Sequence, residues 1–256
     1  MTFNRSFYTF YLILTLLFLT RLQSVEYQGL FYQICDTQGV EKGFLLGSVH
    51  LMEEENFELS KPIKESYENS KCLIVELDTN KHDKDITFKM LTNRKLMNFA
   101  IILGKLYIEE MGLFQGVDNR LINEAYKTNK TVYELESVDT QMNVVIKLSE
   151  DLANIEEDGE ARKLFCDKTT EMIRASVAGS DRELEKIVLE NLDEAAKQEM
   201  IFKRNHEMAI NIDLFLKADN HPFIVVGSGH LLGKEESLVS LLREKGWTLT
   251  RMVHNN

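Results

Sequence analysis

The strongest constraint on the fold is an element that occurs twice, once near each end of the chain. Residues 44–52 read FLLGSVHLM and residues 224–232 read IVVGSGHLL, so each copy is an apolar run followed by Gly-Ser-x-His and two apolar residues. Short apolar runs that end at a glycine are typical of buried strands. The two histidines, His50 and His230, are 180 residues apart. If both strands belong to one sheet, the chain must bring its two ends together.

The remaining pattern places most predicted strands toward the two ends and helices between them. Short β-compatible runs occur at residues 30–34, 43–46, 73–77, 131–135, 223–226 and 248–253, the first two spaced as a hairpin. Residues 86–127 and 141–215 are helical by pattern and composition, with breaks near glycines. We therefore predict one α+β domain over residues 25–256, with a mixed central sheet built from the two terminal thirds and the helical middle packed over it as a cap.

Residues 1–24 differ from the rest of the chain. Arg5 precedes an apolar run at residues 7–20, and the first acidic residue is Glu26. As a helix, these 14 residues would measure about 21 Å, which is short of a bilayer core of about 30 Å. A basic start followed by a short apolar run predicts a signal peptide over residues 1–24. The expected location is secreted, periplasmic or lumenal, and an uncleaved membrane anchor is the alternative.

The net charge and the number of cysteines limit which binding partners and disulfide bonds the chain can have. The chain has 30 basic and 41 acidic residues, for a net charge of −11. An acidic surface repels nucleic-acid phosphates, so we expect no nucleic-acid partner. Membrane contact is expected only through the N-terminal segment, if that segment is retained. Three cysteines (Cys35, Cys72 and Cys166) allow one disulfide at most, and its pairing and the oligomeric state stay open.

The two histidine loops predict a shared metal site. Glycine lets a backbone approach a ligand closely, and two imidazoles that meet at a sheet edge are good ligands for a divalent transition metal. The alternative is an internal duplication in which His50 and His230 have only packing roles. No HExxH helix, P-loop, GxGxxG or GxSxG motif occurs that would indicate another chemistry.

Three charged residues are candidates to complete this site. Glu76 lies inside the apolar run at residues 73–77, where a carboxylate is costly to bury unless it is paired or bound to a metal. Its alternative is a position at a sheet edge, facing solvent. Glu136 follows another predicted strand. Arg204 lies in a helical stretch and is suited to hold a substrate carboxylate or an oxyanion, with a surface charge as the alternative.

Taken together, these motifs resemble the TraB/GumN family, which includes the Tiki-type metalloproteases. The family is marked by a pair of Gly-x-x-His motifs, matched here by residues 47–50 and 227–230. The run LIVELD at residues 73–78 is similar to the family's glutamate-bearing strand. Residues 116–141 are similar to its central G-x-D…LE[ST]…Q region, so Glu136 and Gln141 correspond to family positions. The pair Arg204-Asn205 also resembles the family.

The resemblance implies a fold similar to that of erythromycin esterases and a haem-binding lipoprotein family. It implies a hydrolase that acts on a peptide or protein and uses Mn, Co or Zn to activate water. The hypothesis assigns metal binding to His50, Glu76 and His230, catalysis to Glu76, Glu136 and Arg204, and substrate binding to Gly47, Ser48, Gly227, Ser228 and Asn205. Whether the chain is an enzyme stays open. The alternatives are a secreted peptide- or haem-binding protein without turnover and a structural factor with a vestigial site.

Overall fold

The computed structural model describes residues 25–52, 57–104, 111, 113–156 and 159–252. The predicted signal peptide, residues 1–24, lies outside the described residues. None of the helices in the described part is long and apolar enough to cross a membrane. No disulfide joins Cys35, Cys72 and Cys166, all of which are described.

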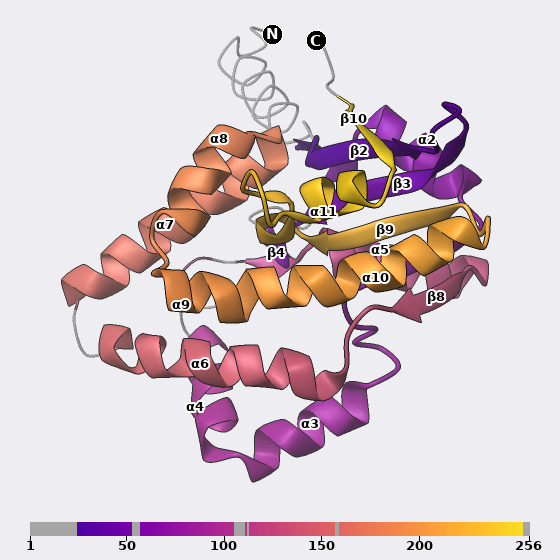
Figure 1. Ribbon diagram of the computed structural model, residues 1–256. Helices are drawn as coiled ribbons and strands as arrows, with labels where there is room; N and C mark the ends of the chain where they lie inside the picture. The colour runs from indigo at the N-terminus through magenta and orange to yellow at the C-terminus, as the bar shows by residue number, and fades with distance from the viewer. Residues whose placement is uncertain (1–24, 53–56, 105–110, 112, 157–158, 253–256) are drawn as a thin grey trace, which may run out of the picture.

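A mixed sheet of six strands forms the centre of the molecule, in the order β10-β2-β3-β9-β6-β8 (Figure 1). Its strands are β2 (Leu30–Cys35), β3 (Glu41–Ser48), β6 (Cys72–Val75), β8 (Thr131–Glu134), β9 (Pro222–Gly227) and β10 (Thr248–Arg251). β10, β2 and β3 are antiparallel, whereas β3, β9, β6 and β8 are parallel to one another. Each strand corresponds to a run predicted from the sequence, and β2 and β3 pair as the predicted hairpin. The predicted α+β class with a mixed sheet is therefore confirmed.

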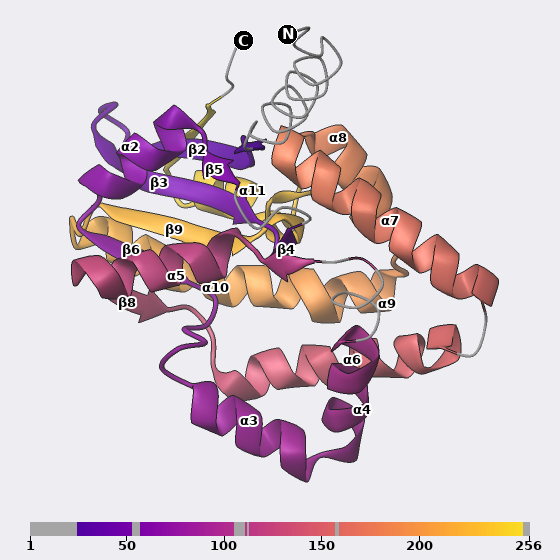
Figure 2. The same cartoon turned by 180° about the vertical axis from the view of Figure 1, so that it is seen from behind.

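Both faces of the sheet are apolar and covered by helices. On β9, Ile224 and Val226 pack into one core with α10 and α11, whereas Phe223 and Val225 pack into the other with α2 and α5. The four helices are α2 (Lys61–Asn69), α5 (Val117–Thr128), α10 (Lys203–Lys217) and α11 (Leu238–Glu244). The two views show α10 and α11 on one side of the sheet and α2 and α5 on the other (Figures 1 and 2). Wholly apolar strands such as β9 are explained by burial on both sides.

The structure differs from the predicted arrangement of sheet and helical cap in two respects. The edge strand β8 comes from the middle of the chain rather than from a terminal third, because α5 returns the chain so that β8 pairs parallel with β6. Helices also cover both faces of the sheet instead of one, since two apolar faces must both be buried. α3 (Asp83–Thr92), α4 (Arg94–Leu103) and α6 (Val138–Glu156) lie together beyond the sheet, below it in Figure 1.

The helical middle is divided more finely than the sequence predicted. Asn93 separates α3 from α4, because its side chain accepts hydrogen bonds from the N–H groups of Lys95 and Leu96 and so caps α4. The other helical segments are α7 (Gly159–Ala178), α8 (Asp181–Leu184), α9 (Glu194–Lys197), the π-helical turns η2 (Glu185–Leu189) and η3 (Gln198–Phe202), and the 3-10 turn η4 (Ser228–Leu231). Short strands β1 (Glu26–Tyr27) and β5 (Glu58–Leu59) pair, as do β4 (Leu51–Met52) and β7 (Phe114–Gln115).

Candidate functional site

Four of the five charged and histidine residues singled out in the sequence follow the ends of the four parallel strands, and the fifth, Arg204, lies on α10. His50 lies two residues after β3, and His230 lies three residues after β9. Glu76 directly follows β6, and Glu136 lies two residues after β8. Because parallel strands end at the same edge of a sheet, all four residues are brought to one edge, where α/β sheets commonly bind ligands. β3 and β9 are neighbours, so the two histidine loops lie side by side.

Three of these side chains converge on Gly227. A Cβ atom placed on Gly227 would lie 3.2 Å from Glu76 Oε1, 3.6 Å from His50 Nε2 and 3.7 Å from His230 Cδ2. His230 Nε2 itself is 3.6 Å from Glu76 Oε1. The glycine therefore leaves open a space between the two imidazoles and the carboxylate that any other residue would fill.

Both imidazoles are oriented by an oxygen acceptor at Nδ1. His50 Nδ1 is 2.8 Å from Asp118 Oδ2, and His230 Nδ1 is 2.6 Å from Asn205 Oδ1. The Asn205 amide is oriented in turn, because its Nδ2 donates to the carbonyls of His230 at 3.3 Å and Glu236 at 2.7 Å. Since a carboxylate or amide oxygen can only accept, Nδ1 carries the proton in each ring. Nε2 of each histidine is thereby left for another partner, which in His50 must displace a proton at neutral pH.

Asp118 reaches His50 because the start of α5 lies against the first histidine loop. The N–H of Gly116 donates to the His50 carbonyl at 2.9 Å, and that of Val117 donates to the Val49 carbonyl at 3.1 Å. A Cβ atom on Gly116 would be 1.9 Å from the Val49 oxygen, so this approach requires glycine. Asp118 was not among the residues predicted for the site, although the G-x-D pattern at residues 116–118 was a usable signal.

The contact with Asp118 also controls the charge of His50. Asp118 raises the pKa of His50 from 6.5 to about 9, against the effect of desolvation, which lowers it. The side chain of His50 is nevertheless 63% exposed, because the ring borders an open cavity. Without another ligand, His50 is therefore protonated at neutral pH.

Glu76 is a buried carboxylate held by three donors. Its Oε1 accepts the Gly227 N–H at 2.5 Å, and its Oε2 accepts Gln141 Nε2 at 2.9 Å and Arg204 Nη2 at 2.7 Å. Burial by itself would raise the pKa of Glu76. The opposing effect of His230, Arg204, His50 and the Gly227 N–H is larger, so the pKa falls from 4.5 to about 2. Glu76 is therefore ionised at neutral pH.

His230 has the opposite electrostatic character to His50. It is 5% exposed, and burial lowers its pKa to about 4 even though Glu76 favours its charged form. His230 is therefore neutral at pH 7, as a metal-ligating imidazole must be. It follows that Arg204, rather than His230, is the permanent positive charge beside Glu76.

Arg204 links Glu76 to Glu136. Its Nε and Nη2 donate to the two oxygens of Glu136 at 2.7 Å each, its Nη2 also reaches Glu76 as described, and its Nη1 donates to the Met200 carbonyl at 2.7 Å. The Glu136 side chain is 4% exposed, and burial raises its pKa despite the guanidinium. All three nitrogens of Arg204 thus have protein acceptors. This places Arg204 and Glu136 as supports behind Glu76, and their predicted roles in oxyanion binding and proton transfer stay predictions.

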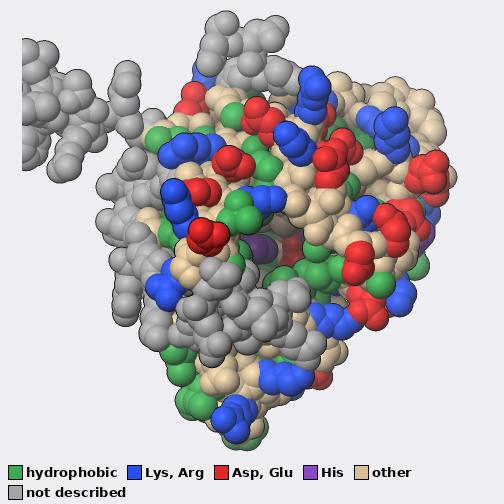
Figure 3. Space-filling model, turned by 90° about the vertical axis from the view of Figure 1, so that its left-hand side faces the viewer, with side chains coloured by type: hydrophobic (Ala, Val, Ile, Leu, Met, Phe, Trp, Pro, Cys, Tyr) green, Lys and Arg blue, Asp and Glu red, His purple; other side chains and the backbone are tan. Residues whose placement is uncertain are grey.

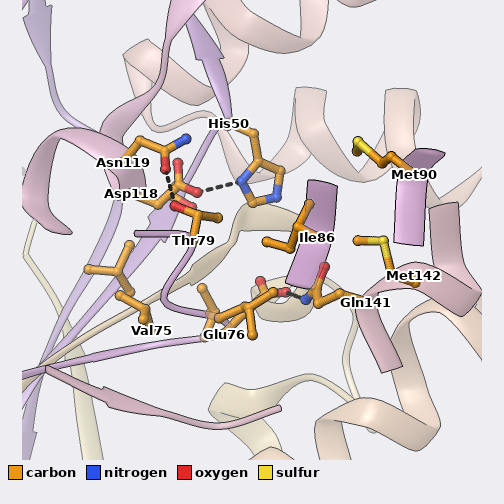
Figure 4. A pocket seen from close by; sticks show the side chains of 14 residues that line it. His50, Val75, Glu76, Thr79, Ile86, Met90, Asp118, Asn119, Gln141 and Met142 are labelled. Carbon is orange, nitrogen blue, oxygen red and sulfur yellow. Dashed lines mark hydrogen bonds and ion pairs between the residues drawn. The ribbon is translucent and has the colours of Figure 1, made fainter. Parts of the chain in front are cut away.

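A cavity of about 280 Å³ opens in front of His50 and Glu76 (Figure 4). Opposite the polar groups its wall is apolar, formed by side chains of α3 and α6: Ile86, Met90 and Met142. Ser48 Oγ and Asp118 Oδ1 at this cavity are buried and have no hydrogen-bond partner among the described residues. The space-filling view shows the hollow, with histidine and acidic side chains at its floor (Figure 3). These two oxygens are therefore polar atoms at the cavity wall that no described protein group satisfies.

The predicted substrate-binding residues divide into two groups. Ser48 lines the cavity, whereas Gly47, Gly227, Ser228 and Asn205 are not among the described residues that line it. Ser228 Oγ donates to the Ser48 carbonyl at 2.9 Å and so joins the two histidine loops, and Asn205 holds His230. Gly227 contributes the open space between the three converging side chains.

Comparisons with known proteins bear on the family of the chain and cover part of the site. The model of the TraB/PrgY/gumN family matches residues 96–251, a span that includes Asp118, Glu136, Arg204 and His230 and begins after His50. The chain is 25% identical over 124 residues to Metalloprotease TIKI2 of Danio rerio; the alignment covers 48% of this chain and 24% of the relative's length. No solved structure matches, so the likeness to erythromycin esterases and haem-binding lipoproteins stays a prediction. Since the family match spans more than half of the sequence, the chain belongs to the TraB/PrgY/gumN family.

Proposed function

We propose that this protein is a metal-dependent hydrolase that cleaves peptide bonds, exported from the cytoplasm by residues 1–24. The observation that carries the proposal is the pair of imidazoles held by Asp118 and Asn205, whose Nε2 atoms lie beside the ionised Glu76 around a glycine. The choice of reaction is supported by family membership and by the similarity to a relative named as a metalloprotease.

The donor chemistry fits a divalent transition metal. Within the described residues, no three His, Cys, Asp or Glu side chains already form a ready cluster of ligands. However, two imidazole nitrogens and one carboxylate are a ligand set typical of catalytic zinc sites, with the remaining position open to water. The oriented Nδ1 protons are the outer contacts that such ligands usually have. His50, His230 and Glu76 would hold the ion, which lowers the pKa of a bound water to about 7.

The chain's own residues supply orientation and selectivity. Asp118 and Asn205 fix the imidazole rings, and Arg204 keeps Glu76 ionised and in place. Ser48 lines the cavity, and its unpartnered Oγ would bind a polar group of a substrate after rotation of the side chain. The apolar wall on α3 and α6 would accept an apolar side chain next to that group.

The alternative is a secreted protein that binds a peptide or haem without turnover. One observation favours it: the oxygens of Glu76 already accept three hydrogen bonds, which leaves the carboxylate less available to a metal. Metal analysis of the purified protein, followed by cleavage of a peptide library with and without a chelator, separates the two functions. The hydrolase should lose cleavage with the chelator and regain it on adding Mn, Co or Zn. Peptide binding without cleavage at every metal loading would establish the alternative.

Replacing Asp118 by asparagine should change how metal binding depends on pH. In the wild type, a proton on His50 competes with the metal, so the apparent affinity should increase by about tenfold per pH unit until the pH approaches the pKa of about 9. In Asp118→Asn the pKa of His50 should fall toward 6.5, so the affinity should level off at a lower pH.

At pH values above 9, where the proton no longer competes, Asp118→Ala, which removes the Nδ1 contact altogether, should weaken metal binding by about 10–100-fold. Titration of metal-free protein with Zn²⁺ between pH 6 and 10 measures both effects. Asp139→Asn, which alters an exposed carboxylate that pairs with Lys89, is the control. Identical pH profiles for the Asp118→Asn variant and the wild type would contradict the assignment of Asp118.

A further inference from the structure

The outer face of α3 and α4 exposes large apolar side chains to solvent. The exposed fraction is 67% for Phe88, 70% for Leu91, 40% for Met97 and 52% for Ile101. Spacings of three and four residues place each pair on one side of its helix. Single exposed apolar residues are ordinary on protein surfaces. Four of them within 14 residues are a concentration typical of an interaction site. We call these four residues the hairpin face.

Basic side chains flank the hairpin face. Lys84 lies one turn before Phe88 on α3, and Arg94 lies one turn before Met97 on α4; both are exposed. Residues 83–103, which form α3 and α4, contain four basic and two acidic residues, for a local charge of +2 in a chain whose net charge is −11; Lys89 is paired with Asp139. The face is therefore cationic on a protein that is otherwise strongly anionic.

The hairpin face is also at an extremity of the molecule. Both ribbon views place α3 and α4 at the end farthest from the upper part of the sheet, and the space-filling view shows hydrophobic and basic side chains gathered at this tip (Figures 1–3). The opposite side of α3 carries Ile86 and Met90, which line the cavity. A surface that binds the hairpin face would therefore lie close to the candidate site.

We propose that the hairpin face docks on an anionic lipid bilayer, with its apolar side chains in the interface and Lys84 and Arg94 against the headgroups. Exposed apolar residues ringed by basic ones are the combination that interfacial helices use. The local charge decides against a second copy of this chain, because two such faces would bring like charges together. The inference goes beyond the proposed hydrolase function and does not depend on it.

The test uses the full chain with one added tryptophan. Phe88→Trp keeps an apolar side chain on the hairpin face, and Leu214→Trp, at a position 61% exposed on α10, is the matched control. Both proteins retain Trp247 as a common background. They are mixed with vesicles of phosphatidylcholine and phosphatidylserine that contain brominated acyl chains, which quench only an inserted indole. Because only an indole that enters the bilayer is quenched, the signal of the added tryptophan reports on α3 even if residues 1–24 also bind the membrane.

Quenching is expected for Phe88→Trp and not for Leu214→Trp. Adding Lys84→Glu and Arg94→Glu should raise the lipid concentration for half-maximal quenching by at least about fivefold for each charge. The proposal is overturned if the two tryptophan variants are quenched equally or not at all, or if quenching is unchanged in vesicles without phosphatidylserine. It is also overturned if the Phe88→Trp indole is already shielded without lipid in a concentration-dependent way, which would identify a second copy as the partner.

Discussion

Replacing His230 by alanine is expected to reduce peptide hydrolysis by about a thousandfold or more, as losses of groups that act as a unit do in other hydrolases. His230 is a buried, neutral imidazole whose Nε2 lies 3.6 Å from Glu76, so the substitution removes one of the proposed metal ligands. It also leaves the Asn205 carbonyl oxygen without its partner, which should destabilise the fold by about 1–3 kcal/mol. Activity and metal content are measured on protein shown to be folded by circular dichroism.

His206→Ala is the control for this substitution. His206 lies on α10 near Arg204, but its side chain is 55% exposed and its ion-pair partner is Glu236, at 3.8 Å. It should keep both activity and metal. A metal-loaded His230→Ala protein that cleaves peptides at the wild-type rate would refute the proposed mechanism, whereas weaker peptide binding in a wild type that never cleaves would favour the binding function.

Replacing Arg204 by methionine is expected to lower the free energy of unfolding by about 3–5 kcal/mol and to abolish activity. The substitution leaves Glu76 and Glu136 as two buried carboxylates without the guanidinium that binds both. Arg204→Lys keeps the charge but loses the planar fork, so its loss should be smaller. Arg182→Met, at an exposed position on α8, should change little.

The pH dependence of stability tests the cause of this effect. In the wild type the pKa of Glu76 is depressed to about 2, so its contribution to stability is present above the unfolded pKa of about 4.5 and is lost only as the pH falls toward 2. Without Arg204, burial should raise the pKa of the carboxylates, and protonation should then stabilise the folded state as the pH falls.

Under this model, the difference in unfolding free energy between wild type and Arg204→Met should be largest near pH 7 and shrink toward pH 5. Urea unfolding at both pH values measures it. A difference that is the same at pH 5 and pH 7 would show that Arg204 acts by packing and not by its charge.

Several elements of the fold could be predicted because their signal is local. The apolar runs that became β6 and β9 are strands because their side chains are buried on both faces of the sheet. The end of α3 at Asn93 was missed, because a single capping side chain gives a weaker signal than a glycine. The pairing of β4 with β7 was missed for a different reason: two-residue strands carry no period that a sequence pattern can show.

The sequence by itself determined the residue types of the site and their place after strands: two histidines in matching glycine loops, and a carboxylate that follows an apolar run. Only the tertiary structure decided which groups act on them. Asp118 is 68 residues from His50, Asn205 is 25 residues from His230, and Arg204 is 128 residues from Glu76, yet each pair is in hydrogen-bond contact. Such pairings depend on the strand order and on the approach of α5 and α10 to the sheet edge. The strand order and the approach of these helices are set by packing between distant segments. Hydrophobic periodicity along the chain therefore cannot predict them.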